Sequence, residues 1–522
     1  MPRVLWWIKK DFRLADNPAL TAALASGADV LPVFLFEPAV LTAAETSAFH
    51  VSAWAQALAG LPVPVLAMHG DAADALGRLH AAAPFEAVYS HEEIGSAVTF
   101  ARDRAVAAWC AAAGVAWHEH RQTGVFRGGV DRDRRDALWR AFTNAGPLPV
   151  PPDLARVSVP GAAQALALAG PLTPERFGHP LTPAQSAARQ PVSESAAAET
   201  LRSFLGERGL GYSGGISSPN RAFESGSRLS VHLAWGTVSG RAVYAATAER
   251  LAELQGVQHP DAAAWRRSLT AFKSRLHWRD HFIQRLETEP AMEVAPLNAA
   301  YADLPTPGGE HLGAWLAGRT GWPLVDACMR CAAETGFLNF RMRALVTSAA
   351  VHSLRVGWRE TLYPAARLWA DYEPGIHIAQ TQMQAGVVGI NQLRVYSPDK
   401  QLADQDPDAV FVRRWIPELA GATAAAIFAH PETPLPGYPL PLVDWQASSR
   451  AMRDDFYAIR ERPETRAIAD AVYLRHGSRL ARSERTWSGP RKTTAKPASK
   501  PAAAPRARAA KTPAPLPLFP DA

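Results

Sequence analysis

Short apolar runs alternate with Ala-rich helical stretches over the first 120 or so residues. The runs are rich in β-branched and aromatic residues and are bounded by Gly, Pro or acidic residues, which is typical of strands. They are "RVLWWI" (3–8), "DVLPVFLF" (29–36), "VPVLAMH" (63–69), "FEAVYSH" (85–91) and "GVAWHEH" (114–120). This alternation predicts an α/β domain over residues 1–125, with a doubly wound parallel sheet and a ligand site at the carboxyl ends of its strands.

The pattern changes after residue 125. Residues 126–200 are rich in Pro, Ala and Gly and show little periodicity, so we expect them to connect two domains. Beyond residue 200 the strand signal fades, and long helical patterns follow with short breaks, such as "AFKSRLHWRDHFIQRLE" and "PLVDACMRCAAETGFLNFRMRALVTSAAVHSLRVGW". We therefore predict an all-α domain over residues 201–480.

Length and composition agree with this division. Single cores stop growing at roughly 250 to 300 residues, so a chain of 522 residues should form two or three folded units. No run of about 18 uncharged apolar residues occurs, and charges follow the first apolar positions closely, which predicts no membrane span and no secretion. The chain has three cysteines, too few to staple it with disulfides, so we expect a reducing compartment and a cytoplasmic protein.

Two of the cysteines, Cys328 and Cys331, form a C-x-x-C inside a helical pattern. No second Cys or His pair follows nearby at the spacing of metal ligands. We interpret them as small buried thiols on a helix rather than as a metal or redox site.

The formal charge of +6 resides in the C-terminal tail. Residues 489–522 hold seven Lys or Arg and one acidic residue, so the rest of the chain is formally neutral. The tail consists mainly of Pro, Ala and Lys, and such a composition cannot offset its ordering entropy, so we expect it to be disordered. Two roles stay open for it: a solubilising extension, or a non-specific arm for nucleic acid.

Several arginines in the predicted helical domain have apolar neighbours. Arg228, Arg279, Arg341 and Arg343 are examples. A buried arginine is costly unless it is paired, and its partner would be a protein carboxylate or a phosphate. Taken one at a time, each of them is also consistent with an ordinary helix surface.

Several segments resemble consecutive motifs of the cryptochrome/DNA photolyase family. They occur in the family's order and span about residues 1–420. The segments are "WWIKKDFRLADNPAL", "SGSRLSVHLAWGTVSGRAVY", "LHWRDHF", "AWLAGRTGWPLVDACMRCAAETGFLNFRMR" and "VFVRRWIPEL". The resemblance implies an antenna domain followed by a helical FAD-binding domain. It also implies a second, light-harvesting chromophore, whose chemistry the sequence does not identify.

The segment "DYEPGIHIAQTQMQAG", residues 371–386, is similar to the family segment that lines the flavin ring of FAD. By this resemblance, Asp371 pairs with Arg343, and Glu373 faces the pyrimidine edge of the flavin. A carboxylate can accept from ring N–H groups, and an arginine beside the ring stabilises an anionic reduced flavin.

The resemblance assigns a second group of residues to FAD. Tyr212, Ser227, Arg228, Leu229 and Ser230 match the residues on the phosphate side, where the amides of a helix start supply positive potential. Arg279 matches the arginine of the family's W-R-E-F motif and is also assigned to cofactor binding.

The sequence departs from the family pattern around the flavin. His377 stands where photolyases have an asparagine beside the flavin N5 atom, and an imidazole there can donate, accept or carry charge. Thr381 and Met383 replace two tryptophans, the first of which is a step of the usual electron-transfer chain. The middle tryptophan of that chain persists as Trp358, and the outermost has no counterpart.

The pocket for the DNA lesion also differs. Trp278 is retained as the stacking platform. Together with His377 beside the flavin and Trp358 of the electron-transfer chain, it forms our predicted set of reaction residues. Arg275 replaces a glutamate three residues before this platform, which reverses the local charge. Phe340 replaces the asparagine of the family's H-N-R motif. Repair of cyclobutane dimers is therefore a weaker expectation than FAD binding.

Three classes of function stay open. The first is a light-driven enzyme that splits pyrimidine dimers in damaged DNA, of the cyclobutane or the (6-4) type, and that acts as a monomer. The second is a cryptochrome-like blue-light photoreceptor without repair activity, which would use a signalling partner. The third is a structural FAD-binding protein. We predict the first.

Overall fold

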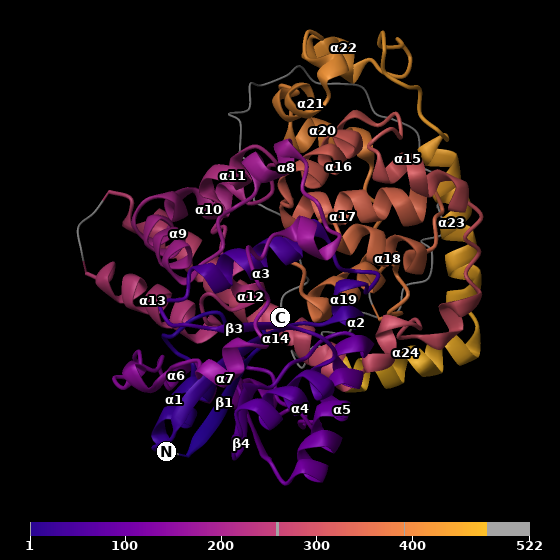
Figure 1. The fold of residues 1–522 in the computed structure, drawn as a ribbon. Coiled ribbons are helices and arrows are strands. Elements are labelled where there is room, and N and C mark those ends of the chain that lie inside the picture. The colour runs from indigo at the N-terminus through magenta and orange to yellow at the C-terminus, as the bar shows by residue number, and fades with distance from the viewer. Residues whose placement is uncertain (1, 257–259, 391, 478–522) are drawn as a thin grey trace, which may run out of the picture.

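The computed structural model describes residues 2–256, 260–390 and 392–477, so the basic tail expected at 489–522 lies outside the described residues. A sheet flanked by helices is followed along the chain by a larger, helical part (Figure 1). The described residues hold no strand after residue 120. Both predicted classes, α/β and then all-α, are confirmed.

Five parallel strands form one sheet in the order β3-β2-β1-β4-β5. Their bounds are β1 (Arg3–Ile8), β2 (Asp29–Phe36), β3 (Leu66–His69), β4 (Ala87–His91) and β5 (Ala116–His120). All five predicted strands are present, and the last three begin two or three residues later than the apolar runs do. In the register of the central pair, Val4 lies opposite Val30.

Side chains of β1 alternate between two cores. Val4, Trp6 and Ile8 pack against α1 (Pro18–Ala25) and α3 (Ala48–Ala59). Leu5 and Trp7 pack against α4 (Ala72–Ala82) and α5 (Ala97–Ala113). Because successive residues of a strand point to opposite faces, an uninterrupted apolar run such as "RVLWWI" belongs to a strand that is covered on both sides.

The described chain holds further α-helices, short and long, which loops and short 3₁₀ or π-helical turns connect. They are α2 (Pro38–Leu41), α6 (Arg135–Asn144), α7 (Gly161–Gln164), α8 (Pro183–Ala188), α9 (Glu194–Gly206), α10 (Tyr212–Gly215), α11 (Arg221–Ser225), α12 (Ser230–Trp235), α13 (Gly240–Glu253), α14 (Ala262–Thr288), α15 (Leu312–Leu316), α16 (Pro323–Thr335), α17 (Phe340–Ser348), α18 (Trp358–Ala366), α19 (Pro374–Ala385), α20 (Pro398–Gln405), α21 (Val410–Trp415), α22 (Ala424–Phe428), α23 (Trp445–Arg460) and α24 (Pro463–His476).

The expected connection, residues 126–200, contains helices that the sequence pattern did not indicate. The longest lying wholly within it, α6, has ten residues. Helices of this length show little periodicity, and their stability comes from packing rather than from local propensity. Here Trp139 of α6 donates a hydrogen bond to Asp280 of α14, at 2.9 Å.

Polar contacts join the two parts of the molecule. Asp16, in the loop after β1, accepts hydrogen bonds from Ser239 and Arg241 of the helical part, and from the backbone amide of Leu148. Arg13 of the same loop donates to the carbonyl oxygen of Gly236, at 2.8 Å. A Cβ at Gly236 would clash with the backbone of Lys10, so the two parts meet there without intervening side chains.

Two further expectations concern cysteines and membranes. Cys328 and Cys331 are fully buried in α16, and burial raises the pKa of the Cys331 thiol to about 12. Among the described residues, no helix combines the length and the apolar character needed to cross a bilayer.

Candidate functional site

An ion pair joins α17 to the turn between α18 and α19. Arg343 Nη2 lies 2.8 Å from Asp371 Oδ1 and 3.1 Å from Oδ2. Burial raises the pKa of Asp371, but the positive charge of Arg343 and a hydrogen bond with Ser230 outweigh it and hold the pKa below its usual value. The carboxylate is therefore ionised at neutral pH, and the pair connects the turn to the start of α12.

The segment Ser227–Ser230 forms a bend that ends at the first residue of α12. Its backbone is held from two sides. Gln190 donates to the carbonyl oxygen of Arg228 at 2.8 Å, and Arg208 donates to that of Ser227 at 3.3 Å. Leu229 and Tyr212 are buried in one apolar cluster beneath the bend. The structure thus brings all five residues assigned to the phosphate side together.

Arg228 has two unusual features. Its φ of 58° lies in the left-handed region, which is rarely occupied by residues other than glycine. Its guanidinium stacks on the ring of Phe337, 3.6 Å from the centroid, while Nη1 is buried without a hydrogen-bond partner. Burial lowers the pKa of Arg228 to about 10. A strained backbone and an unpaired buried donor are features that accompany ligand sites.

Glu373 is the second carboxylate of the turn and precedes α19. Arg279 Nη2 lies 3.5 Å from Glu373 Oε2, and Lys10 Nζ lies 4.0 Å from Oε1. All three line a pocket of about 510 Å³ between the sheet and the helical part. The carboxylate is thus held by one cation from α14 and one from the loop after β1.

His377 lies one turn into α19. Its Nε2 donates to the carbonyl oxygen of Leu362 at 2.7 Å, and its ring meets that of Tyr372 edge to face, with centroids 5.6 Å apart. Burial lowers the pKa of His377 to about 4. The imidazole is therefore neutral at pH 7, and its Nδ1 carries a lone pair.

Trp278 and Trp358 pack into the same apolar cluster. Trp278 projects from α14, and Trp358 is the first residue of α18. Met383, which replaces a tryptophan, is partly buried against this cluster, and Thr381 is buried within α19. Both replacements therefore put small or flexible side chains where the family pattern has indoles.

Arg275, which stands where the family has a glutamate, forms a hydrogen bond with the hydroxyl of Tyr212. Burial raises the pKa of Tyr212 to about 12, so this hydroxyl is protonated at neutral pH. The arginine thus lies between the residue assigned to the phosphate side of FAD and Trp278, which follows on the same helix.

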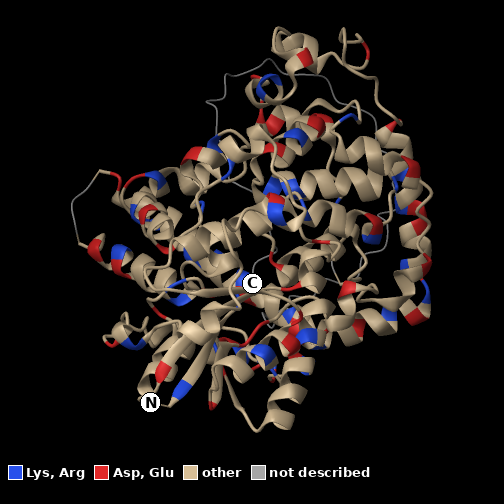
Figure 2. Cartoon of the chain, viewed as in Figure 1, with Lys and Arg blue, Asp and Glu red and all other residues tan. Residues whose placement is uncertain are grey.

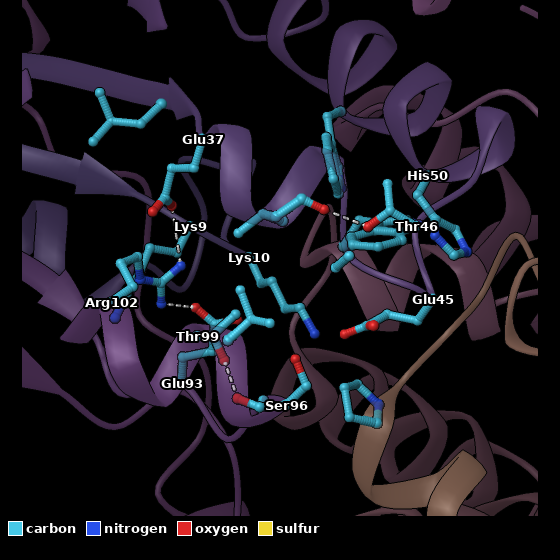
Figure 3. A pocket seen from close by; sticks show the side chains of 18 of the residues that line it. Lys9, Lys10, Glu37, Glu45, Thr46, His50, Glu93, Ser96, Thr99 and Arg102 are labelled. Atoms are coloured by element: carbon cyan, nitrogen blue, oxygen red, sulfur yellow. Dashed lines mark hydrogen bonds and ion pairs between the residues drawn. The ribbon is translucent and has the colours of Figure 1, made fainter. Parts of the chain in front are cut away.

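A second pocket, partly open to solvent, lies at the carboxyl ends of the strands. The loops after β1, β2 and β4 contribute Lys9, Lys10, Glu37 and Glu93, as parallel strands require (Figure 3). Lys10 and Glu45 point toward the middle of the pocket, and His50 lies above Glu45 in this view. Trp54, Trp235 and Tyr372 add aromatic walls.

Arg102 organises one side of this pocket. It pairs with Glu93 at 2.6 Å, Asp103 at 2.9 Å and Glu37 at 3.3 Å. Burial raises the pKa of Glu37 to about 7. Burial also acts to raise the pKa of Glu93, but the charge of Arg102 outweighs it and lowers that pKa to about 2. Glu37 therefore takes up a proton near neutral pH, and this side of the pocket can either donate or accept.

The sequence did not reveal the contacts of four of these residues. Lys10 was visible as part of the loop after the first strand, but its pairing with Glu373 depends on how the two parts pack. Gln190 and Arg208 bind the Ser227–Ser230 bend through its backbone, and such contacts leave no residue pattern. Phe337, the aromatic partner of Arg228, lies within a segment that resembles a family motif, but the resemblance assigns no role to this position.

Comparison with known proteins identifies both parts of the chain. The family model described as DNA photolyase matches residues 4–145, and the one described as the FAD-binding domain of DNA photolyase matches residues 272–458. A deoxyribodipyrimidine photo-lyase of Halobacterium salinarum is 30% identical over 502 residues, covering 88% of this chain and 98% of that protein. The one of Synechococcus is 26% identical over 497 residues, with the same two coverages.

Solved structures agree on the fold. A bacterial class III photolyase from Agrobacterium tumefaciens superimposes with a TM-score of 0.76 at 23% identity, covering 88% of this chain and 98% of that one. An archaeal photolyase from Sulfolobus tokodaii, solved with two FAD molecules, superimposes with a TM-score of 0.71 at 23% identity. The match covers 87% of this chain and 100% of the archaeal one.

Proposed function

The chain belongs to the DNA photolyase family, and we propose that it is an FAD-dependent enzyme that uses light to split pyrimidine dimers in damaged DNA. One observation carries the proposal. The Arg343 and Asp371 pair, the Ser227–Ser230 bend and the Glu373 carboxylate adjoin one another, so a single flavin nucleotide could contact all three.

The residues present fit FAD. The unpaired, buried Nη1 of Arg228 can donate to an anionic phosphate, which is the partner that a desolvated guanidinium requires. Glu373 would accept from ring N–H groups, and Arg343 would stabilise negative charge on the ring. When bound, FAD supplies light absorption and a single electron, which is given to the dimer and returned after the dimer splits.

The remaining residues act on the surroundings of the reaction. Trp278, partly exposed, would stack against a base that has left the helix. Neutral His377 would accept a hydrogen bond at Nδ1 without bringing a charge. Trp358 would take part in electron transfer to the flavin, a role for which Thr381 is unsuited. Arg275 brings positive charge where the family has a carboxylate, so the test covers both cyclobutane and (6-4) lesions.

The pocket at the carboxyl ends of the strands would hold the second, light-harvesting chromophore. Its aromatic walls suit a flat ring, and Glu37, Glu45 and Lys10 offer both donors and acceptors. The archaeal relative from Sulfolobus tokodaii, whose structure holds two FAD molecules, supports the presence of a chromophore besides the flavin.

Damaged DNA would be the partner, and we propose a monomer that works in the cytoplasm. In the view of Figure 2, acidic and basic residues are interspersed over both parts of the described chain. The formal charge outside residues 489–522 is zero, so attraction to DNA would come from local groups of arginines rather than from an overall field.

The test is repair by purified protein containing reduced FAD. DNA carrying one cyclobutane dimer or one (6-4) product would be illuminated with blue light, with a dark sample as reference. We expect light-dependent repair of one lesion in wild type. It should be lost in Glu373→Gln, together with FAD, and retained in Glu310→Gln, whose carboxylate is 68% exposed.

Protein that holds one FAD per chain and repairs neither lesion would contradict the proposed enzyme. That result would favour the cryptochrome-like photoreceptor, which shares the cofactor but not the reaction. Protein that contains no FAD at all would contradict both functions.

A further inference from the structure

Four basic residues form a buried group between α6 and α14, which we call the α6–α14 cluster. Its members are Arg132, Arg135, His281 and Arg285. Arg135 is the first residue of α6, and His281 and Arg285 lie one turn apart on α14. Arg135, His281 and Arg285 are 7%, 8% and 6% exposed, and Arg132 is partly exposed.

The cluster contains more hydrogen-bond donors than acceptors. Arg135 Nη2 lies 2.5 Å from His281 Nδ1, and Arg285 Nη2 lies 3.2 Å from His281 Nε2. Burial and the charges of both arginines hold the pKa of His281 far below its usual value, so the ring is neutral. A neutral imidazole has one lone pair, and a guanidinium only donates, so one of the two contacts has no acceptor.

Other donors of the cluster are unpaired as well. Nε and Nη1 of Arg285 and Nε of Arg132 are buried without a hydrogen-bond partner. Neighbouring carboxylates bind elsewhere: Asp136 is 3.3 Å from His277, and Asp280 is 3.0 Å from Arg279. Among the described residues, no carboxylate forms an ion pair with a member of the cluster.

Asp136 and Asp280 attract Arg135 but form no ion pair with the cluster, so its buried positive charges are incompletely balanced and an anion would stabilise them. We infer that the α6–α14 cluster binds a phosphate-class oxyanion, with Arg285 and Arg135 as its principal donors and Arg132 at its entrance. The planar fork of a guanidinium fits two oxygens of a phosphate at once, and two or three such forks can surround a tetrahedral anion.

Two sources supply this chemistry: free phosphate and a backbone phosphate of DNA. The burial of Arg135 and Arg285 suits a small free anion. The ring of His281 lies 5.2 Å from that of Trp278, which suits a DNA phosphate beside a base stacked on Trp278. The DNA source rests on the proposed function, whereas the oxyanion site itself does not.

The first arm of the test uses inorganic phosphate. Melting temperatures of wild type, Arg285→Gln, Arg132→Gln and Arg104→Gln would be measured against phosphate at constant ionic strength, with chloride as the balancing ion. Arg104 is exposed on α5 and serves as the charge-matched control. We expect phosphate to raise the melting temperature of wild type and control to a plateau. The rise should be absent in the two cluster variants.

The second arm measures the affinity of the same four proteins for duplex DNA at several salt concentrations. Loss of one phosphate contact should lower the salt slope by about 0.9 in both cluster variants but not in the control. A changed slope identifies DNA as a source of the anion, and a phosphate response alone identifies the free ion. Equal responses of all four proteins in both arms would overturn the inference.

Two further readouts keep the test decisive. In phosphate-free buffer, Arg285→Gln should melt no lower than wild type, because it removes a repulsive charge; a purely structural arginine would give a large loss. Arg132→Gln, at a partly exposed position, tests the site if Arg285→Gln does not fold. Neither arm needs light, so failure of wild type to repair dimers would contradict the proposed enzyme without deciding this site.

Discussion

A Cβ on Gly375 would lie 2.5 Å from the Cα of Ile283, so α19 and α14 meet backbone against backbone at this point. No side chain stands between them that could move aside. This contact sets the distance between Trp278 and Arg279 on one helix and Glu373 and His377 at the start of the other.

Replacing this glycine should therefore separate the two helices. We expect Gly375→Ala to lower the free energy of unfolding by about 1 to 3 kcal/mol, as overpacking does, and to reduce FAD content. Gly313→Ala, in α15 with nothing within 4 Å of the new Cβ, is the control and should be neutral or slightly stabilising. Urea unfolding and the flavin absorbance of purified protein measure both effects. Equal stability of the two variants would refute the close contact.

Asp371→Ala should leave Arg343 without its counter-charge. A fully buried ion pair costs about 3 to 5 kcal/mol when one partner is removed, and we expect about 2 to 4 kcal/mol because a quarter of the Arg343 side chain is exposed. FAD content should fall in parallel. Unchanged flavin content and melting temperature in this variant would contradict the role of the pair.

The neutral state of His377 predicts a dependence of stability on pH. Its pKa is about 4 in the fold and about 6.5 in an unfolded chain, so the unfolded state takes up the proton first as the pH falls. The contribution of neutral His377 to the free energy of unfolding is complete above about pH 6.5. It is lost as the pH falls toward about 4, by up to about 1.4 kcal/mol per pH unit. His377→Asn should thus lose less stability than wild type between pH 7 and pH 5.

Melting temperatures across this range provide the measurement, and His69→Asn, at an exposed position at the end of β3, is the control. Burial also lowers the pKa values of His50, His232 and His352 to about 4, so wild type should lose stability steeply over the same range. Identical pH profiles for wild type and His377→Asn would show that the imidazole titrates normally.

Photoreduction of the flavin should follow a different route from the usual tryptophan chain. Thr381 cannot carry an electron hole as an indole does. The ring of Trp369 lies 4.4 Å from the guanidinium carbon of Arg343, which places an indole directly beside the residues assigned to the flavin. We therefore expect Trp369→Phe to slow blue-light reduction of FAD, and Trp358→Phe to have a smaller effect.

Absorbance kinetics under blue light with a thiol donor would decide between the routes. Trp235→Phe tests a second detour, since its indole donates to the carbonyl oxygen of Ala370 at 2.8 Å. Trp322→Phe, in the same apolar core as Trp369, tests a third candidate. Reduction abolished by Trp358→Phe alone would show that the usual chain is completed by a tryptophan elsewhere.

Strands β1 and β2 were predictable from the sequence because each is a short, largely apolar run that is buried in the structure. β5 is only partly buried, and its prediction came from the alternation of strand-like and helical segments. Helices within residues 126–200 were not, because a ten-residue helix such as α6 draws its stability from partners that lie far away in the sequence. The residues assigned to FAD came from motifs, and the structure brings them together, but their roles remain predictions.

Contacts across the two parts were beyond reach of any sequence pattern. The pairing of Lys10 with Glu373 spans most of the chain, and the α6–α14 cluster joins residues nearly 150 positions apart. A sequence shows which side chains carry charge. It does not show which of them the fold leaves without a partner, as with Arg285 and the Nη1 of Arg228.

The contacts of Asp16 indicate that the two parts of the chain depend on each other. Its carboxylate receives donors from Ser239, Arg241 and Leu148, so a chain cut within residues 126–200 would leave this buried charge on one fragment and its cationic partner on the other. Neither fragment would be a portable module for fusion to another protein. Modules of sequence pattern and units of packing thus differ here: the chain carries two families of pattern, but neither part satisfies the Asp16 carboxylate alone.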